Sequence, residues 1–486
     1  MSTPNTSPNV SKAPSGPVDR FFHVTERGSN IATEIRGGLA TFFAMAYIVV
    51  LNPLIIGTAE DVNGETLGIP QVAAVTALIA AISCILMGVV SRYPFAIAAG
   101  MGLNAVVAYG LAPLMPWSDV FLLIIIEGLV LLVLVVTGFR TAVFAAIPPG
   151  IKTAIAVGVG LFLAFIGLVN AGFVQAGEGT PVQLGDGGLN GWPIVVFVLG
   201  LLVSIALYVR RVKGALLIGI VLATVVAIVV ETAFGSGDAE NGLGWSLTVP
   251  SLPTGVGDVA ALPDLSLVGL FADGGFNVLG RWSDIGFATV LMLLFTLLLA
   301  DFFDTMGTMV GVAYEGGLVD EDGNMPNTRE VLVADSFGTV LGGLGSASVN
   351  TVYAESAAGV GEGARTGIAP LVTGGMMLLA TFFTPLVTLV PFEAATPVLV
   401  LVGFMMMTQV VNIDFRDPAL GIGAFLAIIM MPFTYSIANG IGFGLLAYAF
   451  VRLVQGKANQ VHPLLWVISV IFLIHFAEAP IYALLG

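Results

Sequence analysis

Three carboxylic acids lie inside segments that are otherwise apolar. Asp301 and Asp304 occur in LMLLFTLLLADFFDTMG and Glu355 occurs in VNTVYAESAAGVG, neither of which contains a lysine or arginine. Asp301 and Asp304 are three residues apart and therefore share one face of a helix. A carboxylate in apolar surroundings can accept hydrogen bonds from N–H donors, and it can bind and release a proton because burial disfavours its charge. The pattern favours a site for a neutral or weakly basic ligand rich in N–H groups and disfavours an anion site.

Two of the segments that must position these polar side chains have an unusual sequence pattern. Residues 95–112 and 349–363 are short, interrupted by glycine, and flanked by full-length apolar runs. Irregular backbone at mid-membrane persists only where it lines a cavity or binds something, because lipid cannot satisfy its N–H and C=O groups. A matching pair of interrupted segments points to the binding site of an inverted-repeat transporter. The alternative is that these glycines only allow close helix packing, but polar residues such as Asn104 accompany them.

The composition is that of a polytopic membrane protein. Of 486 residues, 57% are hydrophobic and 10% are charged, whereas about a quarter are charged in soluble domains. The net charge of -15 excludes nucleic acid as a partner, and a single cysteine, Cys84, excludes an internal disulfide. The three histidines are too scattered for a metal site. Neither a GxxxxGK[ST] loop nor a nucleophile–base pair occurs, so we expect neither an ATP-driven pump nor an enzyme, and no cofactor other than a co-transported ion.

Apolar segments of membrane-spanning length, about 20 residues, follow one another to the C-terminus. The first half contains 34–57, 71–91, 95–112, 118–138, 150–170, 193–210 and 213–233. The second half contains 284–311, 331–345, 349–363, 367–390, 395–412, 418–433, 435–454 and 464–485. Whether the last of these crosses the membrane stays open, and with it the side of the C-terminus.

The basic residues predict the orientation. With a cytoplasmic N-terminus, every lysine and arginine except Arg281 falls in the tail or in a cytoplasmic loop, as the positive-inside rule requires. The acidic excess gathers in the opposite loops, above all between residues 231 and 284. We therefore expect a multi-pass protein of the cell membrane, surrounded by the lipid bilayer, with its N-terminus in the cytoplasm.

Several long motifs resemble the nucleobase–cation symporters, and among them the purine branch of AzgA-like adenine/guanine/hypoxanthine permeases. The motifs are FFHVTERGSNIATEIRGGLATFFAMAYIVVLNP (21–53), AAGMGLNA (98–105), DFFDTMGTMVGVA (301–313), YAESAAGVGEGARTG (353–367) and MPFTYSIANGIGFG (431–444). The resemblance extends over nearly the whole chain, from Arg20 to these last motifs.

The resemblance implies an all-α membrane fold of about 14 transmembrane segments, arranged as two inverted seven-helix repeats. A core domain would move against a gate domain, and the third and tenth segments would begin as short strands. The corresponding division is a disordered cytoplasmic tail at 1–30, a first repeat at 31–233, an acidic extracellular loop at 234–283, a second repeat at 284–455 and a C-terminal apolar segment at 456–486. It also implies a homodimer formed through the gate domain.

The resemblance carries over to particular residues. Asp304 and Glu355 would bind the ring N–H groups of a purine, and Asn104 would contact its exocyclic group. The remaining residues expected at the substrate are Gly100, Gly102, Ala354, Ser356, Thr308, Tyr353 and Phe43, the last two as candidates for aromatic stacking along with Phe42 and Tyr47. Glu355, Asp304 and Asp301 are the candidates for proton coupling.

The expected function is import of purine nucleobases (adenine, guanine, hypoxanthine) by proton symport, through elevator-like alternating access. The alternatives are a carrier of the same fold for uracil or xanthine, and coupling to Na⁺ instead of H⁺. A channel is disfavoured because its helices would need a continuous polar lining, and a non-transporting scaffold would not need carboxylates in interrupted helices.

Overall fold

The computed structural model describes residues 16–138, 147–177, 179–185, 191–237, 244–246, 248–267, 282–319 and 325–477. The elements of the first half are α2 (Ile31–Met45), α3 (Ile48–Ile56), α4 (Ile69–Val90), β1 (Ile97–Ala99), α5 (Met101–Ala105), the π-helical turn η1 (Val106–Leu111), α6 (Trp117–Val136), α8 (Pro149–Asn170), α9 (Trp192–Val209) and α10 (Ala215–Phe234). The third crossing of this half is therefore a strand followed by a short helix.

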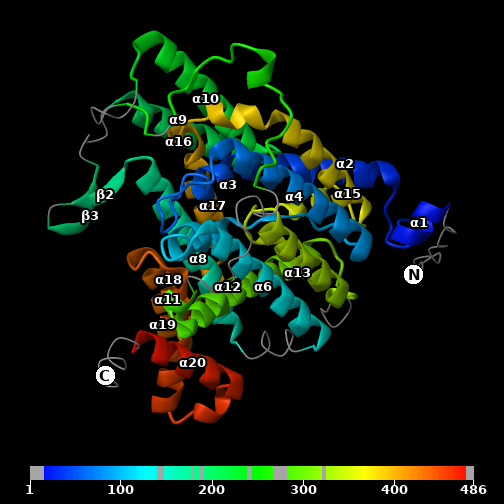
Figure 1. The fold of residues 1–486 in the computed structure, drawn as a ribbon. Coiled ribbons are helices and arrows are strands. Elements are labelled where there is room, and N and C mark those ends of the chain that lie inside the picture. The colour runs from blue at the N-terminus through cyan, green and yellow to red at the C-terminus, as the bar shows by residue number, and fades with distance from the viewer. Residues whose placement is uncertain are drawn as a thin grey trace, which may run out of the picture.

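The second half repeats this order (Figure 1). Its elements are α12 (Phe287–Glu315), α13 (Thr328–Leu344), β4 (Asn350–Val352), α14 (Ser356–Gly361), α15 (Ile368–Ala380), η4 (Thr381–Leu389), α16 (Phe392–Ala395), α17 (Pro397–Met407), η5 (Thr408–Asn412), α18 (Pro418–Phe433) and α19 (Ile437–Val454), with α20 (Pro463–Phe476) after them. The shorter elements of the described chain are α1 (Pro17–Phe22), β2 (Val174–Gly177), β3 (Thr180–Leu184), η3 (Val256–Asp258), α11 (Trp282–Ile285) and η6 (Ala458–Gln460).

Local sequence explains where many of these helices begin. Proline occupies one of the first two positions of α4, α8, α9, α17 and α18, where its missing N–H costs nothing. Asp417 and Ser436 cap α18 and α19 by accepting hydrogen bonds from the backbone N–H groups of Ala419 and Asn439. The apolar runs between such signals leave the backbone no partner in lipid except itself, so they form helices.

The helices pack as two bodies. In the first, the core, α6 packs on α13, and α15 packs on α2 and α4. In the second, the gate, α8 packs on α17 and α18, and α9 packs on α10. Small residues permit these close contacts: a Cβ on Gly128 of α6 would lie 2.8 Å from the Val340 nitrogen, and a Cβ on Gly160 of α8 would lie 2.8 Å from the Gly403 oxygen.

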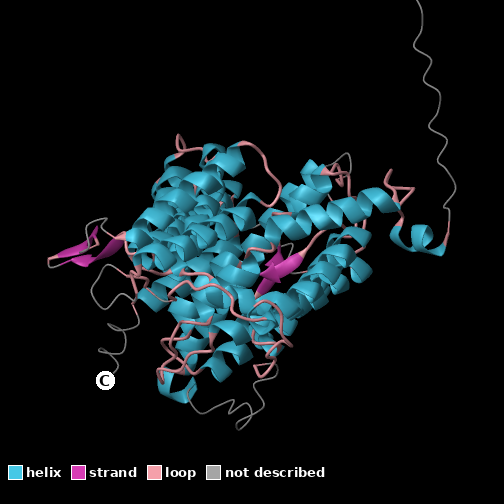
Figure 2. Cartoon of the chain, turned by 90° about the horizontal axis from the view of Figure 1, so that it is seen from above, coloured by secondary structure: helices cyan, strands magenta, loops and turns pink. Residues whose placement is uncertain are grey.

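The two short strands of the interrupted crossings pair with each other. β1 and β4 are antiparallel, with Ile97 opposite Val352 and Ala99 opposite Asn350. Figure 2 shows this pair enclosed by helices, whereas the β2–β3 hairpin projects from one side of the molecule. The strand pair expected in the third and tenth segments is confirmed.

Within the described residues, nine helical stretches are long and apolar enough to cross a membrane. Together with the interrupted crossings around β1 and β4 and with α13, α18 and α19, they coincide with the fourteen expected segments. The fifteenth, α20, packs on α19, and its described part ends at Phe476. Residues 478–485 of the expected segment lie outside the described residues.

The N-terminal region differs from the disordered tail expected over 1–30. Residues 17–22 form α1, which Figure 1 shows at the edge of the molecule beside α2 and α15. Phe22 and Val24 are buried against Ile368 of α15, and the Asp19 carboxylate accepts hydrogen bonds from the backbone and side chain of Thr25. These apolar contacts order the segment although its composition is polar. Residues 1–15 of the expected tail lie outside the described residues.

Candidate functional site

The candidate site is built around the β1–β4 pair. The Gly100 N–H donates to the Val349 carbonyl and the Tyr353 N–H donates to the Ala96 carbonyl, both at 2.9 Å. All six strand residues are buried. The two interrupted crossings are thus joined by main-chain hydrogen bonds, and α5 and α14 begin where the strands end.

Glu355 stands at the first turn of α14 and is held by a tyrosine from the first crossing. Its Oε1 accepts a hydrogen bond of 2.5 Å from the hydroxyl of Tyr47. Tyr47 is 1% exposed, whereas Glu355 is half-buried and the preceding Ala354 is exposed. The carboxyl group of Glu355 is therefore held by Tyr47, while Glu355 is still partly exposed.

Asp304 and Thr308 of α12 also reach accessible space. Both are half-buried, and they are one helical turn apart, so they lie on one face of α12. Asp304 is close enough to interact electrostatically with Glu355 and Asp335. The structure thus brings together the two carboxylates that we expected to bind the ligand.

Asp301 lies in a different setting from Asp304. It is fully buried, and its Oδ1 lies 3.1 Å from the Thr305 hydroxyl, which also lies 2.9 Å from Oδ1 of Asp335 and 2.6 Å from the Thr351 hydroxyl. Thr339 lies 3.2 Å from Oδ2 of Asp301 and donates to the Asn350 carbonyl at 3.0 Å. This buried network ties α12 and α13 to β4, behind the accessible carboxylates.

Sequence reasoning did not single out Asp335. It lies in VLVADSFGTVLGGL of α13 and is fully buried. The signal was present, because the argument that marked Asp301, a carboxylate within an apolar segment, applies equally to Asp335. Its proximity to Asp301 and Asp304 depends on how α13 packs, which no local pattern encodes.

Asn104 on α5 is fully buried, and neither its side-chain oxygen nor its nitrogen has a hydrogen-bond partner among the described residues. A buried polar group without a partner costs about 1–3 kcal/mol. An amide in this condition has both a donor and an acceptor available for a ligand or a water molecule.

Four further residues of the expected site make contacts within the protein. Two side chains form hydrogen bonds, and two glycines lie in close packing contact with a neighbouring side chain. The Tyr353 hydroxyl donates to the Ala99 carbonyl, and the Ser356 hydroxyl accepts from the Ala96 N–H at 3.0 Å. A Cβ on Gly100 would lie 2.6 Å from Cγ2 of Thr351, and one on Gly102 would lie 2.6 Å from Cγ1 of Val159 in the gate helix α8. These residues hold the strand pair and the core–gate contact together.

Phe43 is not brought to the carboxylates. Its side chain is 46% exposed at the end of α2, and its Cβ would lie 3.3 Å from a Cβ on Gly214, at the turn before α10. The aromatic residue of this region that contacts the site is Tyr47.

Comparisons with known proteins agree with this architecture. The sequence pattern of the Permease family matches residues 32–443. The guanine/hypoxanthine permease PbuG of Bacillus subtilis is 38% identical over 462 residues, which cover 94% of this chain and 98% of PbuG. The adenine permease AdeP of Escherichia coli is 33% identical over 461 residues, covering 94% of this chain and 96% of AdeP.

Among solved structures, the transmembrane domain of the cyanobacterial bicarbonate transporter BicA is similar, with a TM-score of 0.59 at 15% identity, covering 84% of this chain and 96% of that domain. At this identity the likeness concerns the fold. It confirms two inverted repeats of seven segments with core and gate domains.

Proposed function

Because the chain belongs to the Permease family, we propose that it imports purine nucleobases by proton symport. Family membership indicates a transporter rather than an enzyme. The names of its relatives, a guanine/hypoxanthine permease and an adenine permease, support purines as the substrate class.

The observation that carries the proposal is the pair of reachable carboxylates, Asp304 and Glu355, between helices of an apolar membrane protein. A purine has N–H donors on its rings, and carboxylate oxygens are strong acceptors for them. The Asn104 amide can donate to an oxo group or accept from an amino group at the edge of the ring system. A neutral, flat ligand with several N–H groups fits this set better than an anion, which two carboxylates would repel.

Proton coupling is proposed at the same groups. Two carboxylates near each other in a poorly solvated site are costly when both are charged, so binding of one proton removes their mutual repulsion and leaves a single negative charge to accept the N–H groups of the ligand. Asp301, behind the site and linked to Asp335 through Thr305, is proposed as a further group that exchanges the proton.

We propose that the core carries the site past the gate in an elevator-like motion. β1, β4 and the ligand-facing residues belong to core elements, and Gly102 meets the gate at Val159 of α8. A rigid displacement of the core along α8 would expose the site to one face and then to the other without remaking the β1–β4 pair.

The test is uptake of radiolabelled hypoxanthine, guanine and adenine by proteoliposomes that contain the purified protein, with and without an inwardly directed proton gradient. A hydrogen bond to a charged group contributes about 1.5–3 kcal/mol, so Asp304→Asn and Glu355→Gln are each expected to lower gradient-driven uptake by roughly tenfold or more. Glu60→Gln, which changes an exposed acid in the loop between α3 and α4, is the matched control and is expected to transport normally.

Two results would redirect the proposal. If uracil or xanthine competes for the carrier while hypoxanthine and adenine do not, the substrate belongs to the alternative class. If a sodium gradient drives uptake and a proton gradient does not, the coupling ion is Na⁺.

A further inference from the structure

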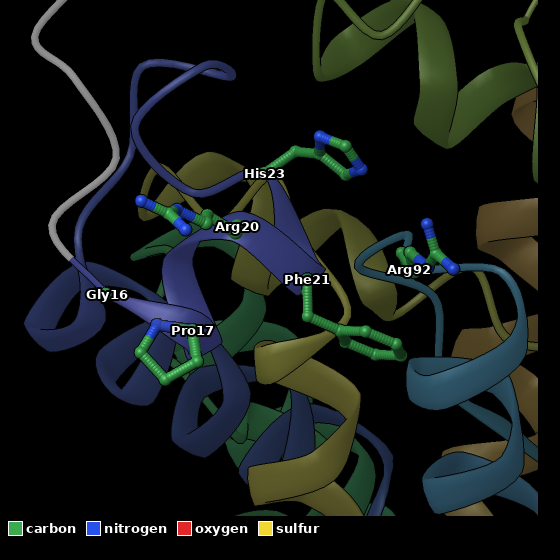
Figure 3. A pocket seen from close by; sticks show the side chains of 6 residues that line it. All are labelled: Gly16, Pro17, Arg20, Phe21, His23 and Arg92. Carbon is green, nitrogen blue, oxygen red and sulfur yellow. The ribbon is translucent and has the colours of Figure 1, made fainter.

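An open groove of about 610 Å³ lies at the N-terminal edge of the protein. It lies outside the candidate substrate site, between α1 and the chain that follows α4 (Figure 3). Its lining residues are Gly16, Pro17, Arg20, Phe21, His23 and Arg92. Figure 3 shows Phe21 extending from α1 on the side of Arg92.

The groove lies where three predicted membrane crossings begin or end. The Arg27 guanidinium donates to the carbonyls of Arg92 and Arg365, at 2.5 and 3.1 Å. Arg92 follows the end of α4, Arg365 precedes α15, and Arg27 precedes α2. Three crossings thus begin or end beside α1, on the face predicted to be cytoplasmic.

Two arginines, Arg20 and Arg92, line the groove. Neither of them forms an ion pair with a described residue. The Arg92 guanidinium lies 4.6 Å from the centre of the Phe21 ring, and its buried Nε has no hydrogen-bond partner in the described part of the chain.

The acids of this region accept hydrogen bonds from other groups and not from Arg20 or Arg92. Asp19 accepts from Thr25, Glu26 pairs with the groove residue His23 at 2.7 Å, and Glu34 accepts from the backbone N–H groups of Arg365 and Thr366. The two guanidinium groups therefore have no carboxylate partner among the described residues and can bind an external anion.

Exposed apolar side chains occur on the helix that carries Arg20 and at the start of the next helix. Val18 and Phe21 of α1 are 52% and 42% exposed, and Ile31 and Ile35 at the start of α2 are 45% and 43% exposed. A ligand that matches this surface has an anionic head and an apolar body. Bilayer lipid meets both conditions and already surrounds the first crossing.

We propose that this groove binds the headgroup of an anionic phospholipid between Arg20 and Arg92, which lie on opposite sides of Phe21 (Figure 3), with the acyl chains against the exposed side chains of α1. The surface of the cytoplasmic leaflet is negative, and basic pockets at this level bind anionic headgroups. The lipid would hold α1 at the membrane surface beside the core.

The experiment measures lipid binding to the purified full chain in detergent, by native mass spectrometry and by thermal unfolding. Phosphatidylglycerol is compared with phosphatidylcholine and with inorganic phosphate. Each basic residue near an anionic surface contributes about a fivefold gain in affinity. We expect phosphatidylglycerol to bind about fivefold more weakly to Arg20→Gln and roughly 30-fold more weakly to the Arg20→Gln/Arg92→Gln chain.

Arg416→Gln is the control, because Arg416 is an exposed arginine in a different loop of the same predicted face. Arg20 is exposed and has no ion-pair partner among the described residues, so Arg20→Gln is expected to fold and tests the proposal even where the double variant folds poorly. Unchanged phosphatidylglycerol affinity in Arg20→Gln overturns the proposal. Binding of phosphatidylcholine as tight as that of phosphatidylglycerol also overturns it. A thermal shift with inorganic phosphate equal to that with phosphatidylglycerol overturns it as well, because the groove would then be a site for any anion.

Discussion

Tyr47 and Phe43 are four residues apart, a spacing that places two side chains on the same face of a continuous helix. α2 ends at Met45 and α3 begins at Ile48, and the backbone of Ala46 and Tyr47 between them stays in the right-handed helical region. Phe43 is 46% exposed, whereas Tyr47 is 1% exposed and donates its hydroxyl hydrogen to Glu355. Helical spacing alone therefore does not tell which of the two aromatic side chains meets the carboxylate.

Replacing Tyr47 by Phe tests this contact. The change removes one hydroxyl from a buried position and leaves the ring, so the fold is expected to persist while Glu355 loses its donor. A hydrogen bond to a charged acceptor contributes about 1.5–3 kcal/mol, and we expect kcat/KM for purine uptake to fall by roughly tenfold or more. Tyr208→Phe, on the gate helix α9, removes a hydroxyl away from the carboxylates and should leave uptake unchanged; an equal loss in both variants would contradict the role of Tyr47.

At the scale of elements, α14 must lie against α2 for Glu355 to meet Tyr47. Two facing glycines permit this approach. A Cβ on Gly37 of α2 would lie 2.9 Å from the Gly359 oxygen, and a Cβ on Gly359 of α14 would lie 2.7 Å from the Gly37 oxygen. These oxygens are backbone atoms, which cannot rotate away. Ala364 Cβ lies closer still to a Cβ on Gly37, at 2.5 Å, and Thr41 Oγ1 lies closer still to a Cβ on Gly359.

Gly359→Ala is therefore expected to push α14 away from α2. Overpacking of this kind costs about 1–3 kcal/mol, and the displaced helix would also move Glu355, so both thermal stability and purine uptake should decrease. Gly361 lies two residues further on the same helix, and nothing lies within 4 Å of a Cβ placed there. If Gly361→Ala impairs stability and uptake as strongly as Gly359→Ala, helix propensity rather than close packing explains the effect.

At the scale of the whole molecule, charge is divided between the two predicted faces. The basic residues, except Arg281, fall on the predicted cytoplasmic side, and the acids of the long loops fall on the other. Some of these acids also organise their loops: Asp61 accepts from the Trp117 N–H at 3.1 Å, and Glu231 accepts from the Trp245 indole at 2.7 Å. The acids of the predicted outer loops thus have two roles. They accept hydrogen bonds that hold these loops together, and their distribution agrees with the predicted orientation of the chain.

Cysteine labelling in intact cells tests the orientation. Cys84 is fully buried, so the unaltered chain should not react with a membrane-impermeant maleimide. Glu60→Cys is expected to react from outside, and Arg416→Cys only after the membrane is permeabilised. The reverse pattern would place the N-terminus outside, contrary to the positive-inside rule.

Much of the fold follows from the sequence because lipid leaves the backbone few choices. Runs of about 20 apolar residues must be helices, and the glycine-rich runs at 95–112 and 349–363 were recognisable as exceptions. The candidate carboxylates Asp304 and Glu355 could also be predicted from the sequence, because a charge within an apolar run has a high energetic cost and is therefore usually functional.

Only the tertiary structure decided which of these residues meet. It assigned Asp301 to a buried network with Asp335 and left Asp304 accessible, although the two are three residues apart. Of the stacking candidates Phe43 and Tyr47, it brought Tyr47 to Glu355, and it gave Gly100 and Gly102 packing contacts with Thr351 and Val159. The physical reason is that periodicity specifies the faces of a helix, whereas the neighbour that each face meets depends on packing between segments more than two hundred residues apart in the chain, such as β1 and β4.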